Sequence, residues 1–116
     1  SAPTTAQYAA IEALQNCADA VERMKNQYNR RRQFVLSRFE EMGLDCFEAT
    51  GAFYVFPESP WEDADAFATA LLEEEEVALV PGDAFGAGGE GHLRASYATG
   101  MDDLREAMDR IERFVS

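Results

Sequence analysis

Residues 77–98 read VALVPGDAFGAGGEGHLRASYA, and this stretch carries the strongest information about the fold. The run 77–80 is compact and apolar, and a Pro-Gly pair ends it, which is typical of a short buried strand. Residues 92–98 alternate well enough to predict a second strand. The glycine-rich segment 82–91 between them predicts a tight turn and a flexible connection, because glycine tolerates backbone angles that other residues avoid.

Helices and further strands are predicted on both sides of this stretch from apolar periodicity and turn residues. The predicted elements are helices over about 4–15 and 17–42, strands at 45–49 and 52–57, a helix beginning at Pro60, strands at 77–80 and 92–98, and a last helix. Helical spacing predicts one apolar face on the helix over 17–42, formed by Val21, Met24, Tyr28, Val35, Phe39 and Met42. It predicts another on the last helix, formed by Leu104, Ala107, Met108, Ile111 and Val115. Helices and strands mix without a regular βαβ alternation. The order therefore predicts an α/β sandwich in which helices pack on a small mixed or antiparallel sheet.

Polar residues and glycine mark where the helices should begin and end. Capping-box spacing begins at Thr4 (TTAQ) and at Ser59 (SPWE), and Thr99 is expected to cap the last helix. Gly43 is a natural stop for the helix over 17–42. That helix is long for a globular protein, which indicates that it spans two bodies.

Composition limits the class of protein. A chain of 116 residues fits one domain, 1–116, without an internal repeat or a linker. Ten basic residues against 22 acidic ones give a net charge of −12, so nucleic acid and anionic membranes are poor partners. Lys25 is the only lysine, and this acidic, lysine-poor surface indicates adaptation to high salt. No apolar run could span a bilayer and no signal peptide is present, so we expect a cytoplasmic protein.

Several candidate sites have a simpler structural explanation. Cys17 and Cys46 lack metal-site spacing, so we interpret both as small core residues, with a disulfide as the alternative. Four glutamates at 73–76 point in different directions on a helix and are expected to be solvated. The basic cluster 29–32 is interpreted as an exposed, ion-paired helix face, and His92, alone, as structural.

The glycine-rich loop is a weak candidate for a phosphate site. It lacks the lysine and the Ser or Thr of a P-loop, and Asp83 and Glu90 would repel an anion.

Arg94 is the strongest candidate for a binding residue. It lies within the predicted strand HLRASYA, where a charge is costly unless it is paired. Alternation places His92, Arg94 and Ser96 on one side of that strand. The planar guanidinium could bind a carboxylate through two parallel hydrogen bonds. Spacing alone favours a structural ion pair over a ligand site, and both remain open.

Five segments, in order along nearly the whole chain, resemble the small domain of class I aminotransferases of the aspartate aminotransferase type, a fold type I family. They are TTAQYAAIEAL (4–14), YNRRRQFVLSRFEEMGLDC (28–46), TGAFYVFPE (50–58), VALVPGDAFG (77–86) and GHLRASYATGMDDLREAMDRI (91–111). The resemblance implies that 1–16 ends a large-domain segment, 17–42 is the interdomain helix and 43–116 is the C-terminal small domain. Family enzymes move an amino group between an amino acid and a 2-oxo acid using pyridoxal phosphate.

The same resemblance implies roles for two residues. Arg94 matches the arginine that binds the substrate's α-carboxylate, and Phe53 matches an aromatic position bordering the substrate pocket. The aspartate and aromatic types share these segments. The full-length enzyme is expected to be a homodimer.

The resemblance also shows what this chain lacks. The cofactor lysine and phosphate-binding residues belong to the missing N-terminal large domain, and Lys25 does not match them, so no pyridoxal phosphate is expected on this fragment, which should be inactive alone. Glu76 stands where the family has glycine, so the turn there is expected to differ. The start of the chain, at a family-internal position, is expected of a fragment. The alternatives are a stand-alone α/β module that binds a carboxylated ligand through Arg94 and a purely structural or interaction domain.

Overall fold

The computed structural model describes all 116 residues, Ser1–Ser116. Four α-helices, three short strands and two 3-10 turns follow one another along the chain. Their bounds are α1 (Thr4–Asn16), α2 (Ala18–Glu41), β1 (Tyr54–Val55), α3 (Ala64–Glu75), β2 (Val80–Pro81), η1 (Gly82–Phe85), η2 (Ala87–Gly89), β3 (Leu93–Ser96) and α4 (Met101–Val115). The predicted mixture of helices with a small antiparallel sheet is confirmed.

The sheet has the order β1-β3-β2, so β3 is its central strand. Both neighbours are antiparallel to β3: Tyr54 is opposite Ser96 in one pair, and Val80 is opposite Arg94 in the other. Each pairing involves only a few residues. The central position of β3 therefore fixes Arg94 between segments that come from two different parts of the chain.

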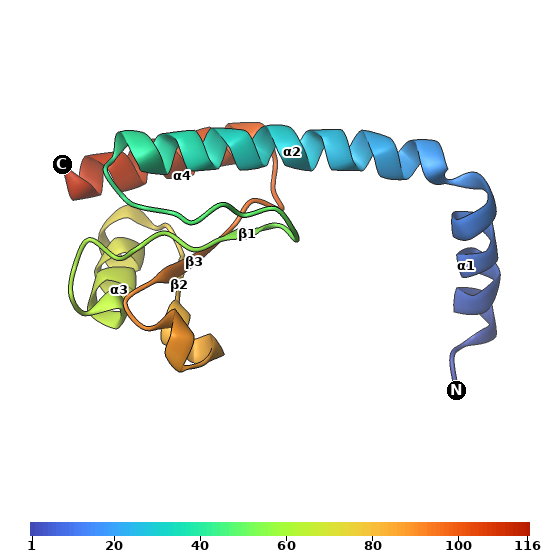
Figure 1. Ribbon diagram of the computed structural model, residues 1–116, viewed down its shortest axis with the longest axis horizontal. Helices are drawn as coiled ribbons and strands as arrows, with labels where there is room; N and C mark the ends of the chain where they lie inside the picture. The colour runs from blue at the N-terminus through green and yellow to red at the C-terminus, as the bar shows by residue number, and fades with distance from the viewer.

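The N-terminal part of the chain stands apart from the rest (Figure 1). Helix α2 extends beyond the sheet, and α1 descends from its free end without a single buried residue. The radius of gyration is 17.0 Å, whereas a compact domain of this length has about 13 Å. None of the helices is long and apolar enough to cross a membrane.

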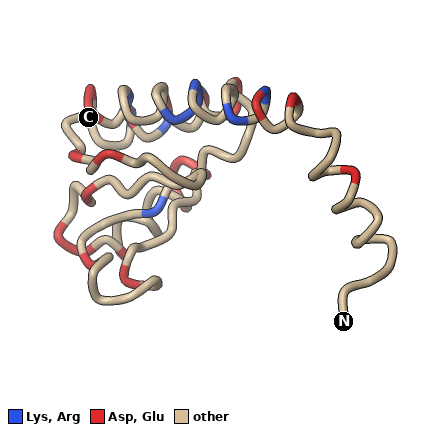
Figure 2. The backbone as a smooth tube through the Cα atoms, turned by 45° about the vertical axis from the view of Figure 1, so that its right-hand side comes forward, with Lys and Arg blue, Asp and Glu red and all other residues tan.

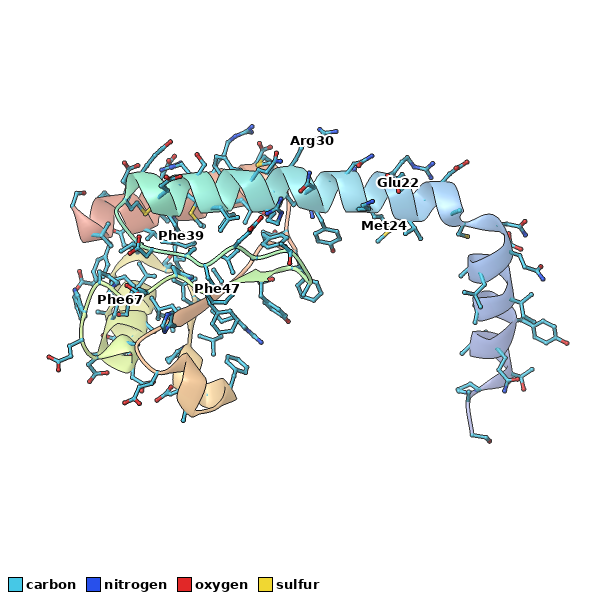
Figure 3. All side chains as sticks on the ribbon, in the orientation of Figure 1. Glu22, Met24, Arg30, Phe39, Phe47 and Phe67 are labelled. Carbon is cyan, nitrogen blue, oxygen red and sulfur yellow. The ribbon has the colours of Figure 1, made fainter.

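One apolar core joins the C-terminal half of α2, the sheet, α3 and α4. Phe39 of α2 and Phe67 of α3, both labelled in Figure 3, are completely buried. The predicted apolar face of α4 is confirmed, because Leu104, Met108 and Ile111 are buried along it. Burial of such apolar surface is the main source of stability in a domain of this size.

The predicted apolar face of α2 is covered over only half of its length. Val35 and Phe39 are buried, but Val21 and Met24 near the N-terminal end are 60% and 54% exposed. Figure 3 shows Met24 on a part of the helix that no other element covers. The apolar face runs along α2 as predicted, and the other elements of this chain cover only its C-terminal half.

The predicted strand at 45–49 is wrong. Only one isolated antiparallel bridge, between Cys46 and Pro57, forms there, and Phe47 is exposed. A strand needs a neighbour for its backbone groups, and a single bridge supplies too few bonds. The strand predicted at 52–57 is shorter than expected, because β1 has only two residues. The strand predicted at 77–80 is displaced: β2 begins only at Val80 and includes Pro81, which was expected to end it.

Two predicted N-caps are displaced. Thr4 is already helical, and Pro3 occupies the cap position of α1 without a side-chain hydrogen bond. The next capping box is also wrong, because α3 begins only at Ala64. Its cap is Asp63, whose carboxylate accepts a 3.0 Å bond from the backbone N–H of Ala66.

The last cap is displaced by one residue, while the predicted helix stop is confirmed. Gly100 is the N-cap of α4, and the Thr99 hydroxyl instead donates to the Asp103 carboxylate at 3.2 Å. Gly43 ends α2 in the left-handed region with φ +77°. The two capping-box spacings match sequence patterns that also occur in loops, whereas a left-handed helix end strongly selects glycine.

Glu76 ends α3 in the left-handed conformation, with φ 57° and ψ 33°. The expectation that the turn would avoid positive φ is therefore wrong. The backbone N–H of Glu76 still donates to Leu72 O at 3.1 Å, as a glycine would at this helix end. Because a Cβ is strained in this region, Glu76 carries a conformational cost.

Candidate functional site

Arg94 is the only basic residue outside the two long helices. Six of the ten basic residues lie on α2 and three on α4, which leaves Arg94 on the sheet. Figure 2 shows the positive charges following these helices, while acidic residues are spread over the molecule. The predicted alternation along β3 is confirmed, because Leu93 and Ala95 are buried and Arg94 lies between them on the other face.

Two aromatic rings flank the Arg94 guanidinium. Its central carbon lies 4.1 Å from the ring centroid of Tyr54 and 4.2 Å from that of Phe85. Tyr54 comes from the neighbouring strand β1, and Phe85 comes from the end of η1. Both distances are well within the range of a cation–π contact.

No carboxylate of this chain pairs with Arg94. None of the protein's ion pairs or side-chain hydrogen bonds involves its guanidinium. The structural ion pair that spacing favoured therefore has no partner here. A guanidinium offers five N–H donors, so Arg94 keeps a full set for an incoming acceptor.

The glycine-rich loop has a packing role that sequence reasoning missed. A Cβ on Gly82 would lie 2.2 Å from the carbonyl oxygen of Gly89, and one on Gly89 would lie 2.1 Å from that of Gly82. The two backbones touch, so both positions require glycine. This contact folds the loop into two 3-10 turns rather than a flexible connection, and the first turn presents Phe85 to Arg94.

Phe53 is connected to Arg94 through the ring of Tyr54. The ring of Tyr54 is 4.5 Å from that of Phe53 and also contacts Arg94. Phe53 is 39% exposed and borders a hollow of about 440 Å³ beside Tyr28 on α2, whose lining does not include Arg94. The family resemblance indicated Phe53 and the strand pattern indicated Arg94, but neither indicated Tyr54, whose ring contacts both.

The remaining candidates take no part in this site. His92 Nδ1 lies 3.0 Å from the carbonyl oxygen of Glu90. Both cysteines are free, so the disulfide alternative is wrong, and neither is fully buried. Burial raises the pKa of the Cys46 thiol to about 11, which keeps it protonated and unreactive at neutral pH.

Two charged clusters differ from expectation. Within the glutamate run, Glu75 and Glu76 are not simply solvated: they form ion pairs with Arg113 and Arg110 of α4. Within the basic cluster 29–32, no arginine forms an ion pair, so that part of the interpretation is wrong. Arg32 instead donates to the carbonyl oxygen of Ala49 at 3.2 Å.

Lys25, the only lysine, lines the same hollow that Phe53 borders. Its side chain is 71% exposed on the uncovered half of α2, with its Nζ 3.8 Å from Glu22. No group of three or more His, Cys, Asp or Glu side chains is arranged to hold a metal ion.

Comparison with known proteins gives consistent matches. The family model for aminotransferase class I and II matches residues 1–111. The chain is 46% identical to an aspartate aminotransferase of Pyrococcus abyssi over 95% of its length, and 45% identical to aromatic-amino-acid aminotransferase 2 of Thermococcus litoralis, also over 95%. The crystal structure of an aromatic aminotransferase from Pyrococcus horikoshii superposes with a TM-score of 0.88, at 46% identity, over 94% of this chain.

These matches cover only part of each relative. The chain spans 29% of the length of both curated enzymes and 30% of the crystallised chain. The family model nevertheless covers nearly all of this chain, including Phe53 and Arg94. The chain therefore belongs to the class I and II aminotransferases.

Proposed function

We propose that the whole protein is a pyridoxal-phosphate-dependent aminotransferase that moves an amino group between an amino acid, of the aspartate or aromatic type, and a 2-oxo acid. In this proposal the chain supplies Arg94, which binds the α-carboxylate of the substrate. One observation carries it: a guanidinium placed at the centre of the sheet, flanked by two rings and without an acidic partner. An arginine held away from internal carboxylates is suited to bind an external one.

The chemistry of the ligand follows from the donors. A guanidinium binds a carboxylate through two parallel, charge-assisted hydrogen bonds, and both amino acids and 2-oxo acids carry that group next to the reacting carbon. Holding the carboxylate fixes the position of the reacting carbon, which lowers the entropic part of the barrier. We place Phe53 at the border of the substrate pocket, where its exposed ring would contact the substrate side chain.

The cofactor belongs to the part of the protein outside this chain. In this proposal Lys25, which is exposed beside Glu22, is not the cofactor lysine. The cofactor, when bound, supplies the electron sink for breaking bonds at the amino acid's α-carbon. The residues of this chain bind and orient the substrate carboxylate.

We propose that 1–16 continues a large domain, 17–42 is the interdomain helix and 43–116 is a C-terminal small domain. The uncovered apolar residues of α1 and α2 support this division. Leu14 is 88% exposed, and Val21 and Met24 continue the same uncovered surface along α2. Such a surface fits burial against a large domain. We also propose a homodimer, which the resemblance implies, and the cytoplasmic location expected from the sequence pattern. The charge of −12 with one lysine supports a halophilic source.

Replacing Arg94 in the intact enzyme tests this function. Two charge-assisted hydrogen bonds are worth about 1.5–3 kcal/mol each, so Arg94→Ala should lower kcat/KM by roughly a hundred- to ten-thousand-fold. Arg94→Lys should recover only part of the loss, because an ammonium lacks the planar fork. Arg105→Ala, at an exposed arginine on α4 paired only with Asp102, is the matched control.

Kinetics and stability must be measured on the same samples, with L-aspartate and L-phenylalanine as donors and 2-oxoglutarate as acceptor. The expected result is a large loss of kcat/KM for Arg94→Ala with little change in Tm or in cofactor absorbance. Unchanged kcat/KM with a lower Tm would show that Arg94 is structural and would exclude the proposed role.

A further inference from the structure

We propose that Tyr54 and Phe85 are positioning residues that hold the Arg94 guanidinium in place before a carboxylate arrives. We call these two residues the aromatic clamp. The inference rests on the proposed function, in which Arg94 binds the α-carboxylate. It adds that the two rings, and not an internal acid, determine the orientation of the cation.

Arg94 contacts both rings of the clamp. The central carbon of Arg94 lies over both rings at nearly equal distances, 4.1 Å from Tyr54 and 4.2 Å from Phe85. Internal hydrogen bonds or ion pairs usually orient an arginine in a sheet, and Arg94 has none. The rings attract the cation through their negative faces without occupying its N–H donors.

Each ring is held by the fold rather than by Arg94 alone. Tyr54 lies on β1, whose pairing with β3 places Tyr54 opposite Ser96, and its ring packs on Phe53 at 4.5 Å. Phe85 ends η1, and its ring makes a T-shaped contact with that of Phe56, with 6.3 Å between the ring centroids. Tyr54 and Phe85 therefore come from segments on opposite sides of the central strand β3.

The backbone contact between Gly82 and Gly89 helps to position Phe85. Gly82 and Gly89 let two stretches of backbone touch, and this closes the turn that ends at Phe85. Because the turn is fixed by backbone packing, Phe85 can remain 51% exposed and still keep its position over the guanidinium.

The clamp should act on binding more than on the chemical step. An arginine side chain has many rotamers, and binding a carboxylate restricts it to one of them, at a cost in conformational entropy. Holding the guanidinium in advance removes that cost from the bound substrate and from the transition state alike. Loss of the clamp should therefore raise KM and leave kcat nearly unchanged.

Ring-removing and ring-retaining substitutions in the intact enzyme test the clamp. Phe85→Leu and Tyr54→Leu should each raise KM about 5-fold, which corresponds to about 1 kcal/mol at 1.4 kcal/mol per tenfold change. Phe85→Tyr and Tyr54→Phe keep a ring and should stay within about twofold of wild type. The donors are L-aspartate and L-phenylalanine with 2-oxoglutarate as acceptor, and Tm is recorded for each variant.

A double mutant separates positioning from general stabilisation. In an Arg94→Ala background no cation remains to be held, so adding Phe85→Leu should cost less than about twofold in kcat/KM. An equal loss in both backgrounds would show that Phe85 has only a structural role and would overturn the clamp.

The outcomes also distinguish this inference from the proposed function. If Arg94→Ala impairs the enzyme but neither Phe85→Leu nor Tyr54→Leu raises KM, the clamp is wrong and Arg94 remains the carboxylate site. If Arg94→Ala has no effect on kcat/KM, the proposed function is wrong, and the clamp fails with it.

Discussion

The hydroxyl group of Tyr97 donates a 2.8 Å hydrogen bond to the carbonyl oxygen of Ala52, 45 residues earlier in the chain. Ala52 has φ +58°, a left-handed conformation that is costly for a residue with a Cβ. The backbone N–H of Tyr97 also donates to the carbonyl oxygen of Phe53, the residue after Ala52, at 2.9 Å. Tyr97 thus binds two consecutive carbonyl groups, those of Ala52 and Phe53, at the end of the turn.

We predict that Tyr97→Phe lowers the free energy of unfolding by about 1 kcal/mol, because the ring still packs but the carbonyl of Ala52 loses its donor. Ala52→Gly in the same variant should recover part of the loss, since glycine tolerates the left-handed conformation. Urea unfolding measures both effects. Tyr8→Phe, at an exposed tyrosine of α1, is the control, and an equal loss there would contradict this account.

Glu76→Gly should stabilise the protein by roughly 1 kcal/mol. Glu76 ends α3 with φ 57°, where glycine avoids the strain of a Cβ. Its carboxylate lies 3.9 Å from Arg110, but it is largely exposed and contributes little. Glu76→Ala keeps the Cβ and should show no such gain in thermal unfolding. Equal stability of Glu76→Gly and Glu76→Ala would show that the Cβ at position 76 causes no strain.

The ion pair between Glu75 and Arg113 predicts a pH-dependent contribution to stability. The hydrogen bond from Arg113, with its charge, holds the pKa of the Glu75 carboxyl below its usual range. The unfolded chain then takes up the proton first as pH falls. The stabilisation is therefore complete above the ordinary glutamate value, about 4.3, and is lost as pH falls through the lower pKa of the folded protein.

Unfolding of wild type and Glu75→Gln across pH measures this contribution. The stability difference between the two proteins should be constant from neutral pH down to about pH 5 and should shrink below about pH 4.3. Glu74→Gln, at an exposed position without an ion pair, is the control for removing one negative charge from the same helix end. A stability difference between wild type and Glu75→Gln that grows as pH falls would contradict this prediction.

We predict that salt stabilises this protein. With a net charge of −12, the 22 acidic residues repel one another in the compact state. Raising ionic strength from about 0.1 M to 1 M shortens the screening length from about 10 Å to about 3 Å, which weakens that repulsion. Thermal unfolding in increasing KCl should show a rising Tm. A flat or falling Tm would argue against adaptation to high salt.

The sequence alone was sufficient for the features that depend on local pattern. Helix periodicity predicted α2 and the buried face of α4, and alternation predicted the two faces of β3. These signals are strong because each repeats over several residues and follows from the geometry of the element itself. The choice of Arg94 came from the same kind of signal, a charge within a strand of small and apolar residues.

Tertiary structure decided the features that depend on residues distant in the chain. No local pattern shows that Tyr54 and Phe85 flank Arg94, because the three lie on different segments that meet only in the folded sheet. The same holds for the absence of a strand at 45–49, where the sequence has strand propensity but the fold supplies only one bridge. Propensity describes what a segment can form, whereas pairing and packing select what it does form.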